Sequence, residues 1–559
     1  MMNIKSMLFL SITILVGTFA QAQSSAPENW FNLDDSMDKV EGVSTEKAYK
    51  SILKDLKSQT VIVAVIDSGV DYEHEDLKDV MWVNADEIPG NNLDDDKNGY
   101  VDDIHGWNFI GGKNGKNVNA DTYEVTRLYG KYKKKYENAN VNTLSKKEKK
   151  EYDKYLEYKE EVEEKFNDAK AQLEQLDATK TLVMGALDAL DKALDGRPMT
   201  QEVLETIDGT SDQNLGIALN IVSRAMEDGE KIESVDELKD GFSDQVDGAI
   251  DHYTNQVKYA YNPDFNARAI VGDDYSNSYE KGYGNNDYEG PDAFHGTHVA
   301  GIIGAVRNNG IGMDGVADNV RIMSLRAVPD GDERDKDVAN AIIYAVDNGA
   351  TVINMSFGKG QSWDKKAVDL ALKYAQKKDV LLVHAAGNSA QNTDVESNFP
   401  TDYYSKRNGK FKKKPAPNWI EVGALSWKGG QDAPATFSNY GKKHVDLFAP
   451  GVAIYSTIPD NNYRNAQGTS MASPVVAGVA AVLRSYFPTL TAVQVKDILM
   501  DSSVKLNEKV KLPGSGELVP FSQLSVSGGV INLYKAAQEA KSTKGKKKIK
   551  VKAPINGKA

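Results

Sequence analysis

Short runs of apolar, largely β-branched residues recur along the chain and constrain its fold more than any other feature. Each has the length of a strand buried on both faces of a sheet. The runs are VIVAVI (61–66), RIMSLRAV (321–328), TVINMSF (351–357), VLLVHAA (380–386) and WIEVGAL (419–425). Helical patterns at 338–349 and 367–379 separate the later runs, and Thr491 with Gln494 forms a capping box that begins a further helix. This alternation predicts an α/β fold with a parallel sheet flanked by helices.

The region 113–289 differs in character and predicts a large all-helical insertion that interrupts the sheet. It is rich in lysine and glutamate, and further helical patterns follow at 181–195, 215–228 and 241–260. Apolar residues recur at steps of three or four, the spacing of one helix stripe, at Tyr155, Tyr158, Val162, Phe166, Ala169, Leu173 and Leu176. The simplest interpretation is that these stripes bury one another in a bundle with solvated charges and no chemistry of its own.

The two ends of the chain have compositions of their own. Residues 1–22 hold Lys5, an apolar run and Ala20-Gln21-Ala22, the order of a cleaved secretory signal peptide. This pattern predicts an exported protein, extracellular or periplasmic, with no stable membrane insertion after cleavage; an uncleaved anchor is the alternative. A short N-terminal segment, 23–58, precedes the sheet domain, which we expect at 59–112 and 290–540. The tail, 541–559, has eight lysines and no acidic residue, and predicts a mobile end or a weak anion-binding handle.

Charge and cysteine content exclude several function classes. The net charge of −14 disfavours binding to nucleic acid or anionic lipid, because the chain as a whole repels phosphate. The absence of cysteine excludes a disulfide scaffold, a thiolate metal site and a cysteine nucleophile.

Three short segments each place a reactive side chain where this fold would expose it. Asp67 ends a buried strand, and ligands bind at the carboxyl ends of such strands. His295 begins HGTHVAG, whose small residues allow a helix to approach the sheet closely. Ser470 lies in GTSMASP at a helix start, where the helix dipole favours negative charge. Each residue alone would be a turn or cap residue, but together they supply the orienter, general base and nucleophile of acyl transfer.

The segments VIDSGVD, HGTHVAG and GTSMASP closely resemble the three catalytic blocks of the subtilisin-like serine proteases, or subtilases. The order Asp, His, Ser differs from that of α/β-hydrolases. The resemblance implies a secreted serine endopeptidase in which Ser470 attacks the scissile carbonyl, His295 moves the proton and Asp67 orients the imidazole. It also implies that Asn388, in HAAGNSA, donates to the oxyanion. His298, three residues beyond His295, is expected to be packed inside the helix start.

The resemblance further implies how substrate binds. Ser356, Phe357 and Gly358, in NMSFG, look like the strand of this family that pairs with an extended substrate backbone. Such pairing implies protein or peptide substrates with broad sequence specificity and requires no organic cofactor. The segment 23–58 is too short for the usual pro-domain of the family, which puts self-processing in doubt. We also hypothesise that the insertion borders the cleft and restricts which substrates enter.

An acidic segment predicts a structural calcium site. Asp94, Asp96, Asn98 and Asp102 space oxygen ligands as in a calcium loop, with Gly99 at the sharp turn. His105 replaces the usual bidentate glutamate, which favours a static site over a switching one; an acidic solvated turn is the alternative. The segment RNNGIGMDGVA (307–317) resembles a calcium-binding loop of the family, with Asn309 as the expected side-chain ligand.

Two other functions compete with the endopeptidase. One is a non-catalytic, calcium-stabilised binding protein on a protease scaffold, which would not need all of Asp67, His295, Asn388 and Ser470. The other is a serine esterase, since the same machinery cleaves esters. The sequence does not predict an oligomeric state.

Overall fold

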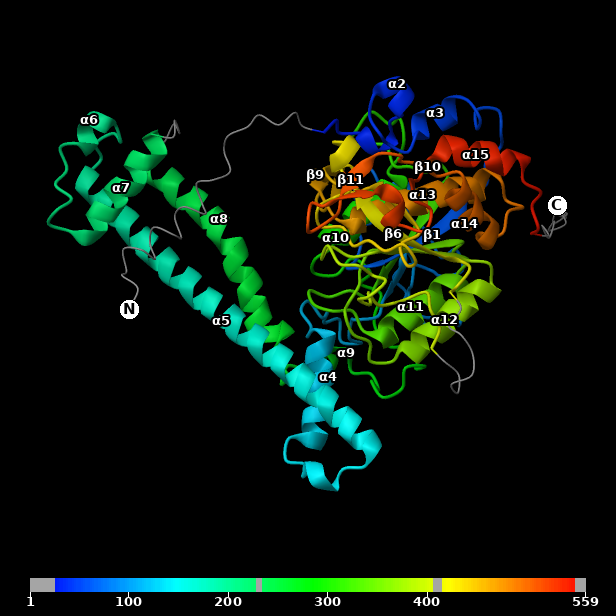
Figure 1. Cartoon of the computed structure of the whole chain (residues 1–559), viewed down its shortest axis with the longest axis horizontal. Helices are drawn as coiled ribbons and strands as arrows, with labels where there is room; N and C mark the ends of the chain where they lie inside the picture. The colour runs from blue at the N-terminus through cyan, green and yellow to red at the C-terminus, as the bar shows by residue number, and fades with distance from the viewer. Residues whose placement is uncertain (1–25, 228–233, 406–414, 548–559) are drawn as a thin grey trace.

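The computed structural model describes residues 26–227, 234–405 and 415–547 (Figure 1). The predicted signal peptide and residues 548–559 of the basic tail lie outside the described residues. No helix of the described part is both long enough and apolar enough to cross a bilayer.

A nine-stranded sheet forms the centre of the molecule, in the order β10-β13-β7-β6-β5-β4-β1-β3-β2. Its neighbours pair in parallel, except β10 with β13. The strands are β1 (Val61–Asp67), β2 (Gly106–Asn108), β3 (Val320–Arg326), β4 (Val352–Met355), β5 (Leu381–Ala385), β6 (Trp419–Leu425), β7 (Leu447–Pro450), β10 (Val504–Lys505) and β13 (Gly529–Val530). All five predicted strands are present, and the parallel α/β prediction is confirmed.

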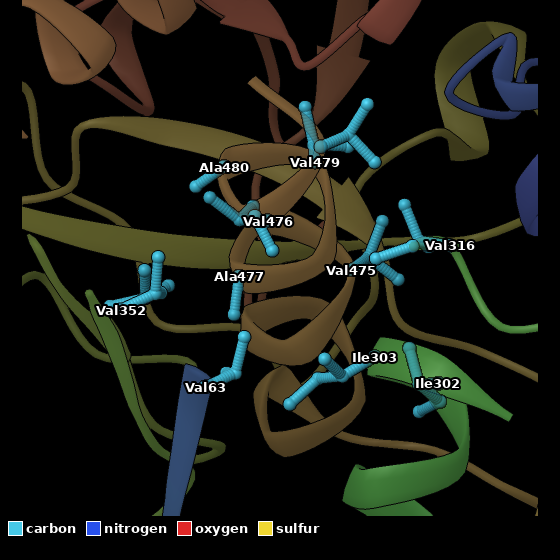
Figure 2. Packing of buried hydrophobic residues seen from close by; sticks show 14 of the residues in the cluster. Val63, Ile302, Ile303, Val316, Val352, Val475, Val476, Ala477, Val479 and Ala480 are labelled. Carbon is cyan, nitrogen blue, oxygen red and sulfur yellow. The ribbon is translucent and has the colours of Figure 1, made fainter. Parts of the chain in front are cut away.

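Alternate residues of a strand point to opposite faces of the sheet. Both faces are apolar here, and helices cover both of them. Val63 packs in the core with α10 (Phe294–Gly304), α13 (Thr469–Tyr486), α14 (Ala492–Asp501) and α15 (Leu533–Ser542), whereas Ala64 packs with α11 (Asp335–Asp347) and α12 (Lys365–Lys377). Figure 2 shows Val476 and Ala477 of α13 beside Val63 and Val352. The predicted capping box begins α14 as expected.

The insertion is a helical arm that extends from the sheet domain (Figure 1). The helical pattern predicted at 181–195 is present, but it continues α5 and does not form a separate helix, and no proline interrupts α5. α5 has 49 residues, a length of roughly 70 Å at 1.5 Å per residue. The helices are α4 (Glu124–Tyr136), α5 (Lys146–Leu194), α6 (Gln201–Leu204), α7 (Gln213–Glu227), α8 (Val235–Asn255) with a π turn at Gln256–Ala260, and α9 (Arg268–Val271).

Two apolar clusters hold the arm together. At its far end Leu187 and Leu190 of α5 pack with Ala218 and Val222 of α7. At its base α4 and α5 share a tyrosine-rich cluster against Trp363 of the sheet domain. The flanking segments 113–123 and 272–289 hold no α-helix and lie against the sheet domain; Asn285, for example, pairs with Asn108 of β2. The helical part is therefore narrower than the predicted 113–289.

The N-terminal segment is folded into the sheet domain. It contains α2 (Asp35–Asp38) and α3 (Thr45–Lys50), and the fully buried Trp30 donates its Nε1–H to the carbonyls of Val452, at 3.2 Å, and Ala453, at 3.1 Å. The backbone N–H of Leu533, at the start of α15, donates to the carbonyl of Val43. Two hairpins, β8 (Ile454–Ile458) with β9 (Asn462–Ala466) and β11 (Lys509–Lys511) with β12 (Leu518–Pro520), complete the fold.

Candidate active site

Asp67 and His295 meet at the carboxyl end of β1. Asp67 is the last residue of β1 and is 1% exposed, and His295 lies in the first turn of α10. The His295 Nδ1 lies 2.6 Å from Asp67 Oδ1, which also accepts the backbone N–H of Ser68 at 2.8 Å. The helix approaches this closely because Gly296 has no side chain: a Cβ there would lie 2.0 Å from the carbonyl oxygen of Gly69.

The environment of His295 favours its protonated form. Burial lowers the pKa of the imidazole, but the charge and the hydrogen bond of Asp67 outweigh burial, so the pKa is raised above its ordinary value. The pKa of His298 is shifted in the opposite direction. It is fully buried in α10, where its Nε2 lies 3.0 Å from the carbonyl of Arg464, and burial lowers its pKa to about 4. His295 is therefore the histidine available for proton transfer.

Ser470 lies in the first turn of α13, held from beneath by a buried polar network. Its Oγ donates to the carbonyl of Ser356 at 3.1 Å, and the Ser356 hydroxyl donates to the Ser470 carbonyl at 2.8 Å. Asn354 donates to the Ser356 hydroxyl at 2.9 Å and accepts from Ser473 at 2.6 Å. In this structure, among the described residues, the hydroxyl bond of Ser470 thus goes to Ser356 and not to His295. A rotation about one side-chain bond redirects that proton, and catalytic hydrogen bonds are often formed only with substrate present.

Asn388 presents an amide donor beside Ser470. Its Oδ1 accepts from the backbone N–H of Thr469 at 2.8 Å and from the Thr469 hydroxyl at 2.9 Å, which fixes the orientation of the amide group. A Cβ at Gly468 would lie 3.4 Å from Asn388 Nδ2 and 3.5 Å from the backbone N of Ser470. Gly468 therefore leaves open the space between two N–H donors, the side-chain amide of Asn388 and the backbone of Ser470. The Ser470 N–H lies in the first turn of its helix and has no partner within that helix.

Two cavities flank the strand segment that begins at Ser356. The larger, of about 330 Å³, is lined by residues that include Ser470, Asn388, Phe357, Gly358 and Gly331. The smaller, of about 280 Å³, is lined by residues that include Asp67, His295 and Ser356. All seven sequence-predicted catalytic and substrate-binding residues therefore line one continuous region at the carboxyl ends of β1 and β4 and the start of α13.

The match to known proteins agrees with this arrangement. The profile of the Subtilase family matches residues 58–518, which is most of the chain. The chain belongs to the subtilase family.

Individual relatives match about two fifths of this subtilase. It is 42% identical over 231 residues to "Thermophilic serine proteinase" of Bacillus sp. (strain AK1), which is 41% of this chain and 50% of the relative. It is 38% identical over 218 residues to "Subtilisin DY" of Bacillus licheniformis, 38% of this chain and 72% of the relative. It is 40% identical over 192 residues to "Thermitase" of Thermoactinomyces vulgaris, 34% of this chain and 61% of the relative. The match thus spans about half the length of the first of these relatives.

A buried ion cluster joins the arm of this subtilase to its cavities, and the sequence analysis did not predict it. The Nζ of Lys359, directly after Gly358, lies 2.7 Å from Glu124 at the start of α4 and 2.9 Å from Asp335. Arg127 of α4 donates to the carbonyls of Asp332 and Glu333, both at 3.2 Å. Residue spacing could not reveal these contacts, since more than 200 residues separate α4 from its partners.

The acidic segment after β1 is arranged differently from the sequence-based expectation. Glu87, Asp96 and Asp103 bring one carboxylate oxygen each within 4.8 Å of one another. The predicted ligands Asp94 and Asp102 accept backbone N–H groups, from Asn98 and Gly99 and from Gly90 and Asn92, and Glu87 and Asp96 also accept backbone N–H groups. The predicted ligand Asn98 donates its side-chain amide to Asp96 and to Asp103, both at 3.0 Å. Three oxygen donors, two of them buried, fit a hard cation such as calcium, with Glu87 and Asp103 as ligands that the loop spacing did not indicate.

The second predicted calcium ligand lies beside a buried carboxylate. Asn309 donates its Nδ2–H to Asp76 at 2.6 Å, and the backbone N–H of Met313 donates to Asp76 at 3.3 Å. Asp76 is fully buried, and burial raises the pKa of its carboxyl group. The Asn309 Oδ1 accepts the backbone N–H of Ile311 at 3.1 Å, so the buried carboxylate that could bind a hard cation here is that of Asp76, which the sequence analysis did not select.

Proposed function

We propose that this subtilase is an exported serine endopeptidase that cleaves peptide bonds through an acyl-enzyme on Ser470. The observation that supports it most directly is the 2.6 Å contact of Asp67 with His295 in the region that also holds Ser470 and Asn388. The signal pattern at 1–22 supports export.

The proposed reaction begins with attack of the Ser470 oxygen on the scissile carbonyl. The neutral His295 takes the serine proton and later gives it to the leaving amine, while Asp67 stabilises the imidazolium and holds its tautomer. The negative charge that develops on the carbonyl oxygen is stabilised by Asn388 Nδ2–H and by the backbone N–H of Ser470. Water then hydrolyses the acyl-enzyme with His295 as the base.

The substrate is proposed to bind as an extended strand between Gly331 and Gly358. Both glycines line the larger cavity, and the lack of side chains lets another backbone approach them. Backbone pairing does not depend on side chains, which supports cleavage of many different sequences.

Calcium is proposed to stabilise the fold rather than to take part in the reaction. The cluster of Glu87, Asp96 and Asp103 would hold one ion, and Asp76 with Asn309 would hold another. In each case a bound cation would offset the repulsion or the burial of carboxylates near the sheet.

Labelling with a serine-directed fluorophosphonate tests the proposal, with Ser470→Ala as the matched control. We expect the parent protein to be labelled and the variant to be unlabelled. A parent that resists labelling would favour the non-catalytic binding protein. Digestion of casein by the untreated parent protein then separates an endopeptidase from an esterase, which would cleave ester substrates only.

A further inference from the structure

Glu333 is a buried carboxyl group in the wall of the larger cavity. Its residue is 2% exposed and lines the cavity across from Phe357 and Gly358. Its Oε1 has no hydrogen-bond partner among the residues that the structure describes. Buried polar atoms are normally paired, so an unpaired carboxyl oxygen beside a substrate cavity suggests a partner that arrives with the ligand.

The neighbouring cations do not neutralise Glu333. The ammonium of Lys359 contacts the carboxylates of Glu124 and Asp335 and donates to the backbone carbonyl of Glu333 at 2.6 Å, not to its side chain. Arg334 is held by Asp121, at 2.7 and 2.8 Å. These cations are thus already paired with other acids.

The surroundings of Glu333 disfavour the ionised form of its carboxyl group. Burial raises its pKa most, Lys359 opposes the rise, and the charges of Asp332 and Asp335 add to it, which brings the pKa to about 8. A cation placed beside the carboxyl group would relieve this repulsion and favour its ionised form.

The other charged groups that line the two cavities are mostly acidic as well. In the larger one the exposed Glu396 stands among the lining residues, and Lys359 is the only lysine or arginine there. Asp292 and Asp330 line the smaller cavity, and Asn255 of α8 donates to Asp330 at 2.7 Å. Arg326, in the same cavity, is buried and donates to the carbonyls of Ser68 and Val118 and to the side chain of Asn108. Among the described residues that line the two cavities, the acidic groups therefore outnumber the basic ones.

We propose that Glu333 is a specificity-determining residue that selects peptides with a lysine or arginine side chain on the acyl side of the scissile bond. The basic side chain enters the larger cavity and pairs with the Glu333 carboxylate as a charge-assisted hydrogen bond. This preference adds to the sequence-tolerant backbone pairing described above. It rests on the proposed endopeptidase function.

A set of fluorogenic peptides tests the proposal. Each of the four positions before the cut carries arginine, lysine, methionine or glutamate in turn, and kcat/KM is measured for the full chain, for Glu333→Gln and for the matched control Glu517→Gln. Glu517 is exposed and lines neither cavity. Glutamine keeps the size of the buried side chain.

We expect the basic peptides to be cleaved at least about 10-fold faster than the methionine peptide at one position, since 1.4 kcal/mol corresponds to tenfold. In Glu333→Gln this ratio should fall to about 2 or less, whereas Glu517→Gln should keep the ratio of the parent. In the parent, the ratio should also rise between pH 6 and 8 as Glu333 ionises, a readout that needs no variant.

The absence of a basic preference at every position would overturn the proposal, and so would a preference that Glu333→Gln leaves intact. Neither result would touch the endopeptidase itself, because fluorophosphonate labelling and casein digestion would remain positive. The loss of both of those activities in the parent would refute the proposed function instead.

Discussion

The substitution Lys359→Met should destabilise this protein strongly, because it removes one partner of a fully buried ion cluster. The Lys359 side chain is 1% exposed, and its partners Glu124 and Asp335 are 0% and 6% exposed. Methionine fills a similar volume but removes the buried cation that Glu124 shares with Arg127, and it leaves Asp335 without an ion-pair partner among the described residues.

The expected loss in the free energy of unfolding follows from the burial of the ion pair rather than from its N–O distance. Removal of one partner from a buried pair costs about 3–5 kcal/mol, because the other charge stays desolvated. The pair of Lys511 with Asp432 has the same separation, 2.7 Å, but its side chains are 50% and 52% exposed. Removal of an exposed partner costs about 0–1 kcal/mol. Lys511→Met is therefore the matched control for Lys359→Met.

Urea unfolding followed by tryptophan fluorescence measures both changes. All variants should carry Ser470→Ala, so that self-digestion of unfolded chains does not distort the curves. We expect a large drop in the unfolding midpoint for Lys359→Met and almost none for Lys511→Met. Equal shifts in the two variants would refute the argument that burial determines how much these ion pairs contribute to stability.

Three further predictions concern catalysis and calcium. Asn388→Leu should lower kcat by about 10²–10³ with little change in KM, the range found for loss of the oxyanion amide in subtilisin, and a kcat within a few-fold of the parent would contradict the assigned role. Because Asp67 raises the pKa of His295, kcat/KM should rise with pH through a midpoint above the ordinary histidine value; in Asp67→Asn the residual activity should show a lower midpoint, and an unmoved midpoint would disprove the coupling. EDTA should lower the thermal unfolding midpoint of the parent, and it should lower that of Asp103→Asn by less. A parent midpoint that EDTA leaves unchanged would count against bound calcium.

The strands and the reactive residues could be predicted because their signals are local. A buried parallel strand is a short apolar run wherever it occurs, and Asp67, His295 and Ser470 each stand at the end of such a strand or at the start of a helix. The meeting of Asp67 with His295 follows from where β1 ends and α10 begins, once both pack on one sheet.

The ion cluster and the acidic ligand set could not be predicted in this way. Lys359 and Glu124 look like ordinary surface residues in sequence, and only the packing of α4 against the segment after β4 buries them. In the acidic segment, the turns of the backbone bring Glu87 and Asp103 beside Asp96, and neither residue belongs to the ligand spacing on which the prediction rested. The continuous α5 was divided in the prediction because apolar spacing alone does not mark where a helix ends.

The attachment of the N-terminal segment has a consequence for the order of events during synthesis. Trp30 is anchored by carbonyls at 452 and 453, and Val43 by the backbone of Leu533, so the first described residues find their partners only when nearly the whole chain has left the ribosome. Ser470 likewise comes late, about 400 residues after Asp67. A nascent chain that ends before Ser470 therefore lacks the proposed nucleophile, and its N-terminal segment still lacks the contact with Leu533.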